Sequence, residues 1–92
     1  MPLSTKEKVR LRGEAMRLKP ALKVGREGFT EGVRKQLDAL LAQHPLLKIR
    51  LEIDDRAQRA AVVEAIAPAV GAEFIGATGK TAVFFREGAR PS

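Results

Sequence analysis

Residues 23–32 read Lys23-Val24-Gly25-Arg26-Glu27-Gly28-Phe29-Thr30-Glu31-Gly32, a pattern typical of a short strand, a G-x-x-G loop and the start of a helix. The loop glycines permit backbone angles that other residues avoid, and their missing side chains allow a partner to approach the backbone closely. The unpaired N–H groups at the start of the following helix would point back at the loop and favour a bound phosphate. This loop is therefore the predicted functional end of the protein.

The chain contains a second G-x-x-G tetrapeptide, Gly76-Ala77-Thr78-Gly79, so the pattern alone is a weak signal. Gly79-Lys80-Thr81 also matches the end of a nucleotide-binding P-loop, but Phe74 occupies the position of the first P-loop glycine. The apolar run after Thr81 predicts a strand, whereas a P-loop needs a helix whose N–H groups bind phosphates. The sequence therefore excludes nucleotide hydrolysis and leaves Lys80 either solvated or in contact with a phosphate.

Two helices flank the strand and the loop. Ser4 and Glu7 form a capping box that predicts a helix running to about Leu18. Thr30 is placed to cap the helix that follows the loop, which ends near His44. Apolar residues recur at helical spacing in both segments and are expected to face the core. These residues are Leu11, Ala15 and Leu18 in the first helix, and Val33, Leu37, Leu40, Leu41 and His44 in the second.

The second half of the chain completes the sheet. Residues 46–53 alternate between apolar and polar side chains, which predicts a strand with one face in the core and the other in water. A third helix follows, for which Asp55 and Gln58 are placed to form a capping box, and residues 73–77 and 81–86 predict a tight hairpin. The predicted fold class is α/β, an α-β-α-β-α-β-β two-layer sandwich with a four-stranded mixed sheet.

Positive charge is concentrated at the start of the chain. The net charge is +6, and residues 1–28 carry eight Lys and Arg against three Glu, which accounts for +5 of that total. Such an excess indicates an anionic partner, although a basic first helix could also serve only solubility. The chain has four Phe but no Tyr or Trp, so recognition is expected to depend on phosphate and sugar more than on stacked bases.

Catalytic and metal-binding chemistry lack the residues that they need. The chain has no cysteine, and its one histidine, His44, stands before a proline without a serine, cysteine or aspartate arranged around it. No apolar run approaches the roughly 20 residues that span a bilayer. We therefore predict one domain, residues 1–92 with an ordered core of about 4–86, that is cytoplasmic and has no catalytic activity, cofactor, metal or small-molecule substrate.

Several spaced segments resemble one known family. They are Leu18-Lys19-Pro20, Val24-Gly25-x-x-Gly28-Phe29-Thr30-Glu31-Gly32-Val33, His44-x-Leu46-x-Lys48-Ile49, Gly71-Ala72, Ile75-Gly76 and Gly79-Lys80-Thr81. The combination is similar to the YhbY-like proteins, which are stand-alone members of the CRM (chloroplast RNA splicing and ribosome maturation) domain family. The resemblance implies a compact fold similar to the C-terminal domain of a bacterial translation initiation factor and a G-x-x-G loop comparable to that of KH domains. It also implies binding to structured RNA and, for bacterial single-domain members, association with precursors of the large ribosomal subunit.

The prediction is therefore a monomeric RNA-binding protein that docks its basic first helix and its G-x-x-G loop on ribosomal RNA. The residues expected to contact RNA are Arg10, Arg17, Lys19, Lys23, Gly25, Arg26, Glu27, Gly28 and Lys80. One alternative is a protein-interaction module that adds an exposed sheet edge to a partner and presents the basic helix to an acidic protein. A second alternative is nucleic-acid binding without specificity.

Overall fold

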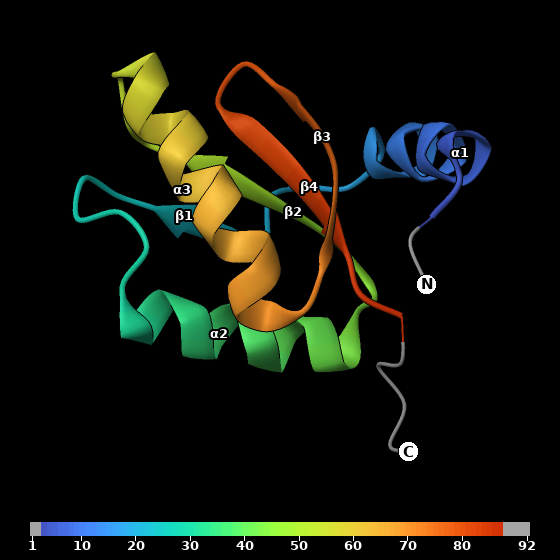
Figure 1. The fold of residues 1–92 in the computed structure, drawn as a ribbon, viewed down its shortest axis with the longest axis horizontal. Helices are drawn as coiled ribbons and strands as arrows, with labels where there is room; N and C mark the ends of the chain where they lie inside the picture. Colours follow the sequence, from blue (N-terminus) through green and yellow to red (C-terminus); the bar gives the residue numbers. More distant parts are fainter. Residues whose placement is uncertain (1–2, 88–92) are drawn as a thin grey trace.

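The computed structural model describes residues 3–87, and its elements follow the predicted order (Figure 1). They are α1 (Thr5–Ala15), β1 (Leu22–Val24), α2 (Glu31–Gln43), β2 (Leu46–Leu51), α3 (Arg56–Val70), β3 (Glu73–Thr78) and β4 (Thr81–Phe85). The mixed α/β class with a four-stranded sheet is thereby confirmed.

The sheet has the strand order β1-β2-β4-β3. β1 and β2 are parallel, because α2 carries the chain back across the sheet between them, and the other two pairings are antiparallel. β3 and β4 form the predicted hairpin, in which Gly79 takes a positive φ of 59° at the first turn position. Because β4 starts at Thr81, a strand and not a helix follows Gly79-Lys80, which agrees with the rejected P-loop.

One face of the sheet packs against α2 and α3. The predicted alternation of β2 is confirmed, since Leu47, Ile49 and Leu51 are buried on this face together with Ile53 just beyond the strand. Leu37 and Leu41 of α2 meet them, as their helical spacing predicted, whereas His44 is exposed at the end of α2. The other buried residues of this cluster are Val24, Val62, Ile66, Val70, Ala82 and Phe84.

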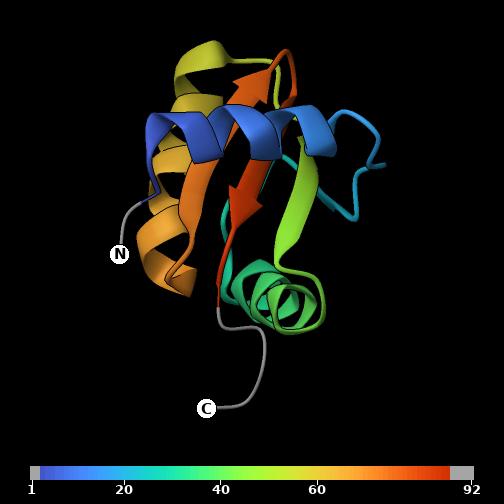
Figure 2. The same ribbon diagram turned by 90° about the vertical axis from the view of Figure 1, so that its right-hand side faces the viewer.

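The opposite face of the sheet is covered by a helix and not exposed to water, so the prediction of two layers was wrong. Figure 2 shows α1 lying across this face, on the other side of the sheet from α2 and α3. Leu11 and Ala15 of α1 form a second buried cluster with Ile75 and Val83. The hairpin strands carry apolar residues toward both faces, so the second face also needs a cover. The fold therefore has three layers.

The helix N-termini match the predicted caps at two of three sites. Ser4 and Glu7 form the capping box of α1, and the Thr30 hydroxyl accepts the N–H of Val33 at 3.2 Å. Gly71 ends α3 with a φ of 65°, and Pro68 lies within the last turn of that helix. Two expectations are wrong.

The first error concerns α1, which ends at Ala15, so that Leu18 is 37% exposed instead of buried. The second concerns α3, because no side chain caps its N-terminus. Asp55 occupies the cap position without a hydrogen bond, and Gln58 reaches the backbone of the G-x-x-G loop instead. A polar side chain in a first helical turn has several possible acceptors, and tertiary packing decides between them.

Candidate nucleic-acid interface

The G-x-x-G loop is a tight turn in which the two glycines differ in role. The N–H of Gly28 donates to the carbonyl of Gly25 at 2.9 Å and closes the turn. Gly28 is buried with a φ of 77°, a backbone conformation that favours glycine. Gly25 is exposed and lies outside the positive-φ region, and a Cβ there would meet only the Oε1 atom of Glu27, at 3.8 Å. The backbone conformation therefore requires glycine at residue 28. At residue 25 the absence of a side chain leaves the backbone of the turn accessible to a ligand.

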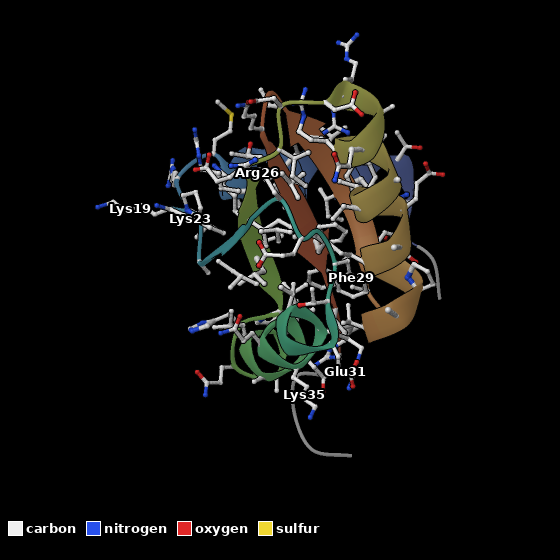
Figure 3. The ribbon with its side chains drawn as sticks, turned by 90° about the vertical axis from the view of Figure 1, so that its left-hand side faces the viewer. Lys19, Lys23, Arg26, Phe29, Glu31 and Lys35 are labelled. Carbon is white, nitrogen blue, oxygen red and sulfur yellow. The ribbon has the colours of Figure 1, made fainter. Side chains whose placement is uncertain are left out.

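The turn lies beside α3 rather than beside the helix that follows it. Gln58 of α3 donates to the carbonyl of Arg26 at 3.5 Å, and a Cβ on Gly28 would lie 3.6 Å from Val62 of the same helix. Figure 3 shows Phe29 between Arg26 and Glu31, the first residue of α2. Because Phe29 packs partly buried on the main core, it separates the turn from α2. That the N–H groups of α2 point at the loop stays a prediction.

Basic side chains gather on the α1 side of the sheet, next to the turn. Lys23 pairs in register with Arg50, so both side chains lie on the same face of the sheet, and Lys48 lies on it two residues earlier in β2. In the view of Figure 3, the side chains of Lys19, Lys23 and Arg26 all lie in the upper left part of the molecule, away from Glu31 and Lys35 of α2. We call the following residues the basic face: Arg12, Lys19, Lys23, Lys48 and Arg50.

The cations at this end of the sheet are not equally available to a ligand. Arg50 bonds Glu52 at 2.7 Å, and this hydrogen bond, with a smaller effect of nearby Lys23, lowers the pKa of Glu52 below its usual value. Lys80, predicted as solvated or a phosphate contact, bonds Asp54 at 2.7 Å and lowers the pKa of that carboxyl. By contrast, within residues 3–87 no carboxylate lies within 4.0 Å of the cationic groups of Lys19, Lys23 and Arg26.

The structure does not bring Arg10 to the loop. Arg10 pairs with Glu14 at 3.8 Å, and Glu14 lies on the flank of α1 that faces His44 and Pro45. Those residues precede β2, whereas the loop follows the far end of β1, which runs parallel to β2. Arg17 is exposed in the turn after α1. The predicted site residues thus form a group of Lys19, Lys23 and Gly25–Gly28, with Lys80 ion-paired nearby and Arg10 apart from them.

Sequence reasoning missed three residues of the basic face. Arg12 is one of the eight basic residues in residues 1–28, and the charge count gives it no individual role; the alternation of residues 46–53 predicts only that Lys48 and Arg50 face water. The alternation of residues 46–53 did place the last two on one side. Their neighbour on that side, Lys23, follows from the parallel pairing of β1 and β2, which no local pattern reveals.

Two further observations concern other kinds of site. Among residues 3–87, no three or more His, Cys, Asp or Glu side chains come together where they could hold a metal ion. None of the helices in that range combines the length and the apolar character that crossing a membrane requires.

The fold and the site define a small mixed α/β domain with one basic face and an exposed glycine turn at its edge. The chain belongs to the CRS1 / YhbY (CRM) domain family, whose model matches residues 3–86. This match confirms the resemblance seen in the sequence.

Relatives with similar sequences or structures carry consistent names. A Pseudomonas aeruginosa protein named "Probable RNA-binding protein" is 29% identical over 92 residues, which cover 100% of this chain and 88% of that protein. A Haemophilus influenzae protein named "RNA-binding protein" is 33% identical over 84 residues, 91% of this chain and 85% of the relative. The solution structure of a candidate RNA-binding protein from Staphylococcus aureus superposes with a TM-score of 0.84 at 27% identity, over 94% of this chain and 90% of that one. The family and these names indicate a protein that is not an enzyme.

Proposed function

We propose that this protein binds structured RNA through the G-x-x-G turn and the basic face, and that its target is ribosomal RNA during assembly of the large subunit. The observation that carries the proposal is the group of unpaired cations, Lys19, Lys23 and Arg26, around an exposed glycine turn. Phosphate contacts of this kind supply most of the affinity of nucleic-acid-binding proteins. Membership of the CRM family and the names of the relatives support RNA as the ligand. The ribosomal target rests on the resemblance to YhbY-like proteins.

The turn offers backbone donors as well as side-chain charge. Within residues 3–87, the N–H groups of Arg26 and Glu27 donate to no protein acceptor, so a phosphate oxygen can accept from them. Because Gly25 has no side chain, a phosphate can approach the backbone of the turn closely. The Glu27 carboxylate acts in the opposite direction, because it repels a phosphate at the same place. Affinity at the turn is therefore the balance between these donors and one carboxylate.

Gly25→Asp tests this binding mode without disturbing the backbone. A side chain fits at residue 25, so the variant should fold normally, while the added carboxylate should weaken binding to a structured ribosomal RNA fragment by about 1–2 kcal/mol. Gly32→Asp is the matched control, since it places the same charge in the first turn of α2, where Asp is favourable. Gly28→Asp should also weaken binding, but its positive φ would add a loss of stability.

Glu27→Lys is the reciprocal test and should strengthen binding. Affinities from fluorescence anisotropy, with thermal melts of every variant, separate binding from folding. If Gly25→Asp and Glu27→Lys both bind the RNA as the parent does, the turn is only structural and the proposed mode is wrong.

The protein-interaction alternative finds less support in this fold. β3 is an edge strand that could add to a partner sheet, but a bulge between Phe74 and Gly76 interrupts its register. In addition, the side chain of Arg12 already donates a hydrogen bond to the carbonyl of Ile75 on that strand. Co-sedimentation with ribosomal precursors that ribonuclease abolishes would support RNA as the partner, and co-sedimentation that survives ribonuclease would favour the protein alternative.

A further inference from the structure

A pocket of about 320 Å³ lies on the basic face, between α1 and the strands that α1 crosses. Figure 2 shows α1 crossing these strands, with the tip of the β3–β4 hairpin on one side of α1 and α2 beyond the other side. The residues that line the pocket are Arg12, Ala15, Met16, Lys48, Gly76, Thr78, Thr81 and Val83. The G-x-x-G turn is not among them, so this is a separate feature of the same face.

Arg12 is held in place by the strand beneath it. Its Nη2 group donates to the carbonyl of Ile75 at 3.1 Å. A Cβ on Gly76 would lie 2.8 Å from the Nε atom of Arg12, closer than real Cβ atoms approach a neighbour. The glycine therefore lets the guanidinium lie directly against β3. Within residues 3–87, Arg12 uses one of its five N–H groups, in the bond to Ile75, so the side chain is pre-organised for a ligand that accepts hydrogen bonds.

The pocket has the charge of an anion site. Its lining contains two cations, Arg12 and Lys48, and no carboxylate. Neither cation has an ion-pair partner within residues 3–87. The larger groove between α3 and the hairpin differs, because Glu64 lines it beside two arginines. Of these two cavities, therefore, the pocket under α1 is the one whose lining contains cations but no carboxylate.

The remaining walls fit the other parts of a nucleotide. The Thr81 hydroxyl donates to the carbonyl of Thr78 at 2.8 Å, which leaves its oxygen free to accept a hydrogen bond from a ribose 2′-hydroxyl. Ala15 and Val83 form an apolar floor, and the Met16 side chain at the rim is 80% exposed. A thioether over an apolar floor suits the face of a base.

We infer that this pocket receives one unpaired nucleotide of the bound RNA, with its phosphate between Arg12 and Lys48 and its ribose hydroxyl at Thr81. The inference rests on the proposed function and adds a subsite to it. Continuity of the surface supports it, since Thr81 pairs in register with Arg50, which in turn pairs with Lys23 next to the turn. An RNA strand that follows the basic face from the turn therefore reaches the pocket directly.

The first experiment probes the pocket without RNA. Adenosine 5′-monophosphate, its 2′-deoxy analogue and inorganic phosphate are titrated separately into the ¹⁵N-labelled protein. We expect the amide signals of Gly76, Thr78 and Thr81 to shift with the ribonucleotide, to shift less with the other two ligands, and to stay unchanged in Lys48→Gln. Absence of a shift at these amides in the parent protein would overturn the inference, whether or not the protein binds RNA.

The second experiment uses RNA hairpins with and without a single-nucleotide bulge. We expect the parent to bind the bulged hairpin at least fivefold more tightly, and Lys48→Gln to lose that preference. Gly76→Ala should lose it as well, because the added methyl displaces Arg12. Lys35→Gln is the matched control, since Lys35 lies on α2 away from Arg26 (Figure 3) and its removal should leave the preference intact.

The outcomes separate the two proposals. Tight binding of both hairpins by the parent, with no preference for the bulge, would contradict the pocket and leave the proposed function standing. Failure of the parent to bind either hairpin, together with ribonucleotide shifts in the pocket, would contradict the proposed function and leave the pocket as a nucleotide site.

Discussion

The two faces of the sheet are built differently, although the same four strands supply both. The face that packs on α2 and α3 buries twelve apolar residues, including Phe84 and Ile49, both without measurable exposure. Among residues 3–87, the face under α1 buries only four, and Lys23, Lys48 and Arg50 lie on the same face. α1 contacts β2 and β3 in particular, so it leaves charged strand residues uncovered. The comparison indicates that the face under α2 and α3 supplies most of the stability, whereas the face under α1 buries less apolar area and carries exposed positive charge.

The largest expected effect tests this division with the same substitution on each face. Leu41→Ala removes a fully buried side chain of α2 and should lower the free energy of unfolding by about 3–5 kcal/mol. Leu11→Ala in α1 should cost about 2 kcal/mol, because its small cluster can collapse or admit water more easily. Urea unfolding of both variants measures the difference. Equal losses would show that the two faces contribute alike and break the comparison.

A smaller effect is expected for the arginines that fasten a helix to each face. Arg86, just after β4, donates to the Val70 carbonyl at 3.0 Å, to the Asp38 carbonyl at 2.9 Å and to the Asp38 carboxylate. Arg12 makes one such bond, to Ile75. Arg86→Ala should therefore destabilise the protein by about 1–2 kcal/mol, and Arg12→Ala by less than about 1 kcal/mol, measured by urea unfolding.

If Arg12→Ala lowered the free energy of unfolding more than Arg86→Ala, the main role of α1 would be structural and not ligand binding. Leu47→Ala would serve as the positive control for a large loss, since Leu47 is 3% exposed on the α2 and α3 face.

The third prediction concerns charge and distinguishes positions within the basic region. Lys23→Gln removes an unpaired cation next to the turn and should reduce the slope of log affinity against log salt by about 0.7–0.9. Arg10→Gln should change the slope by much less, because Arg10 pairs with Glu14 on the other flank of α1. RNA titrations at several salt concentrations provide the slopes. Identical slopes for the two variants would mean that net charge, and not the basic face, controls binding.

The smallest expected effect is the response to acid. Hydrogen bonds from Arg34, Arg86, Arg50 and Lys80 lower the pKa values of Glu31, Asp38, Glu52 and Asp54, respectively. A carboxyl with a lowered folded-state pKa stabilises the fold above its ordinary value, 4.5 for Glu and 3.8 for Asp, and loses that contribution as pH falls through the lower value. Thermal melts between pH 6 and pH 3 should show a small loss that high salt reduces, since these pairs are exposed. A rise in stability toward pH 3 would contradict this assignment.

Much of the first face could be predicted from the sequence. Alternation in residues 46–53 and helical spacing in residues 33–41 are local patterns, and burial of Ile49 and Leu37 followed from them. The second face could not be predicted in the same way. Val83 and Phe84 are adjacent apolar residues that face opposite clusters, and the sequence does not show which of them requires a helix above it.

The candidate site was predictable to the extent that it is local. The G-x-x-G turn and the cations Lys19, Lys23 and Arg26 lie close together in the chain, and the structure keeps them together. The contribution of Lys48 and the position of Arg10 depend on strand pairing and on the direction in which α1 crosses the sheet. The ion pair of Lys80 joins residues that are 26 positions apart, which no local pattern encodes.

The central position of β4 also determines when the protein can fold. β4 is the last of the four strands of this sheet along the chain, yet it lies between β2 and β3 and supplies Phe84 to one apolar cluster and Val83 to the other. A nascent chain that stops before β4 has neither cluster complete and no pairing partner for the inner edge of β2. Because these contacts join distant parts of the chain, they form late and cooperatively. The domain is therefore expected to fold only after β4 has been synthesised, and to acquire both of its faces at the same moment.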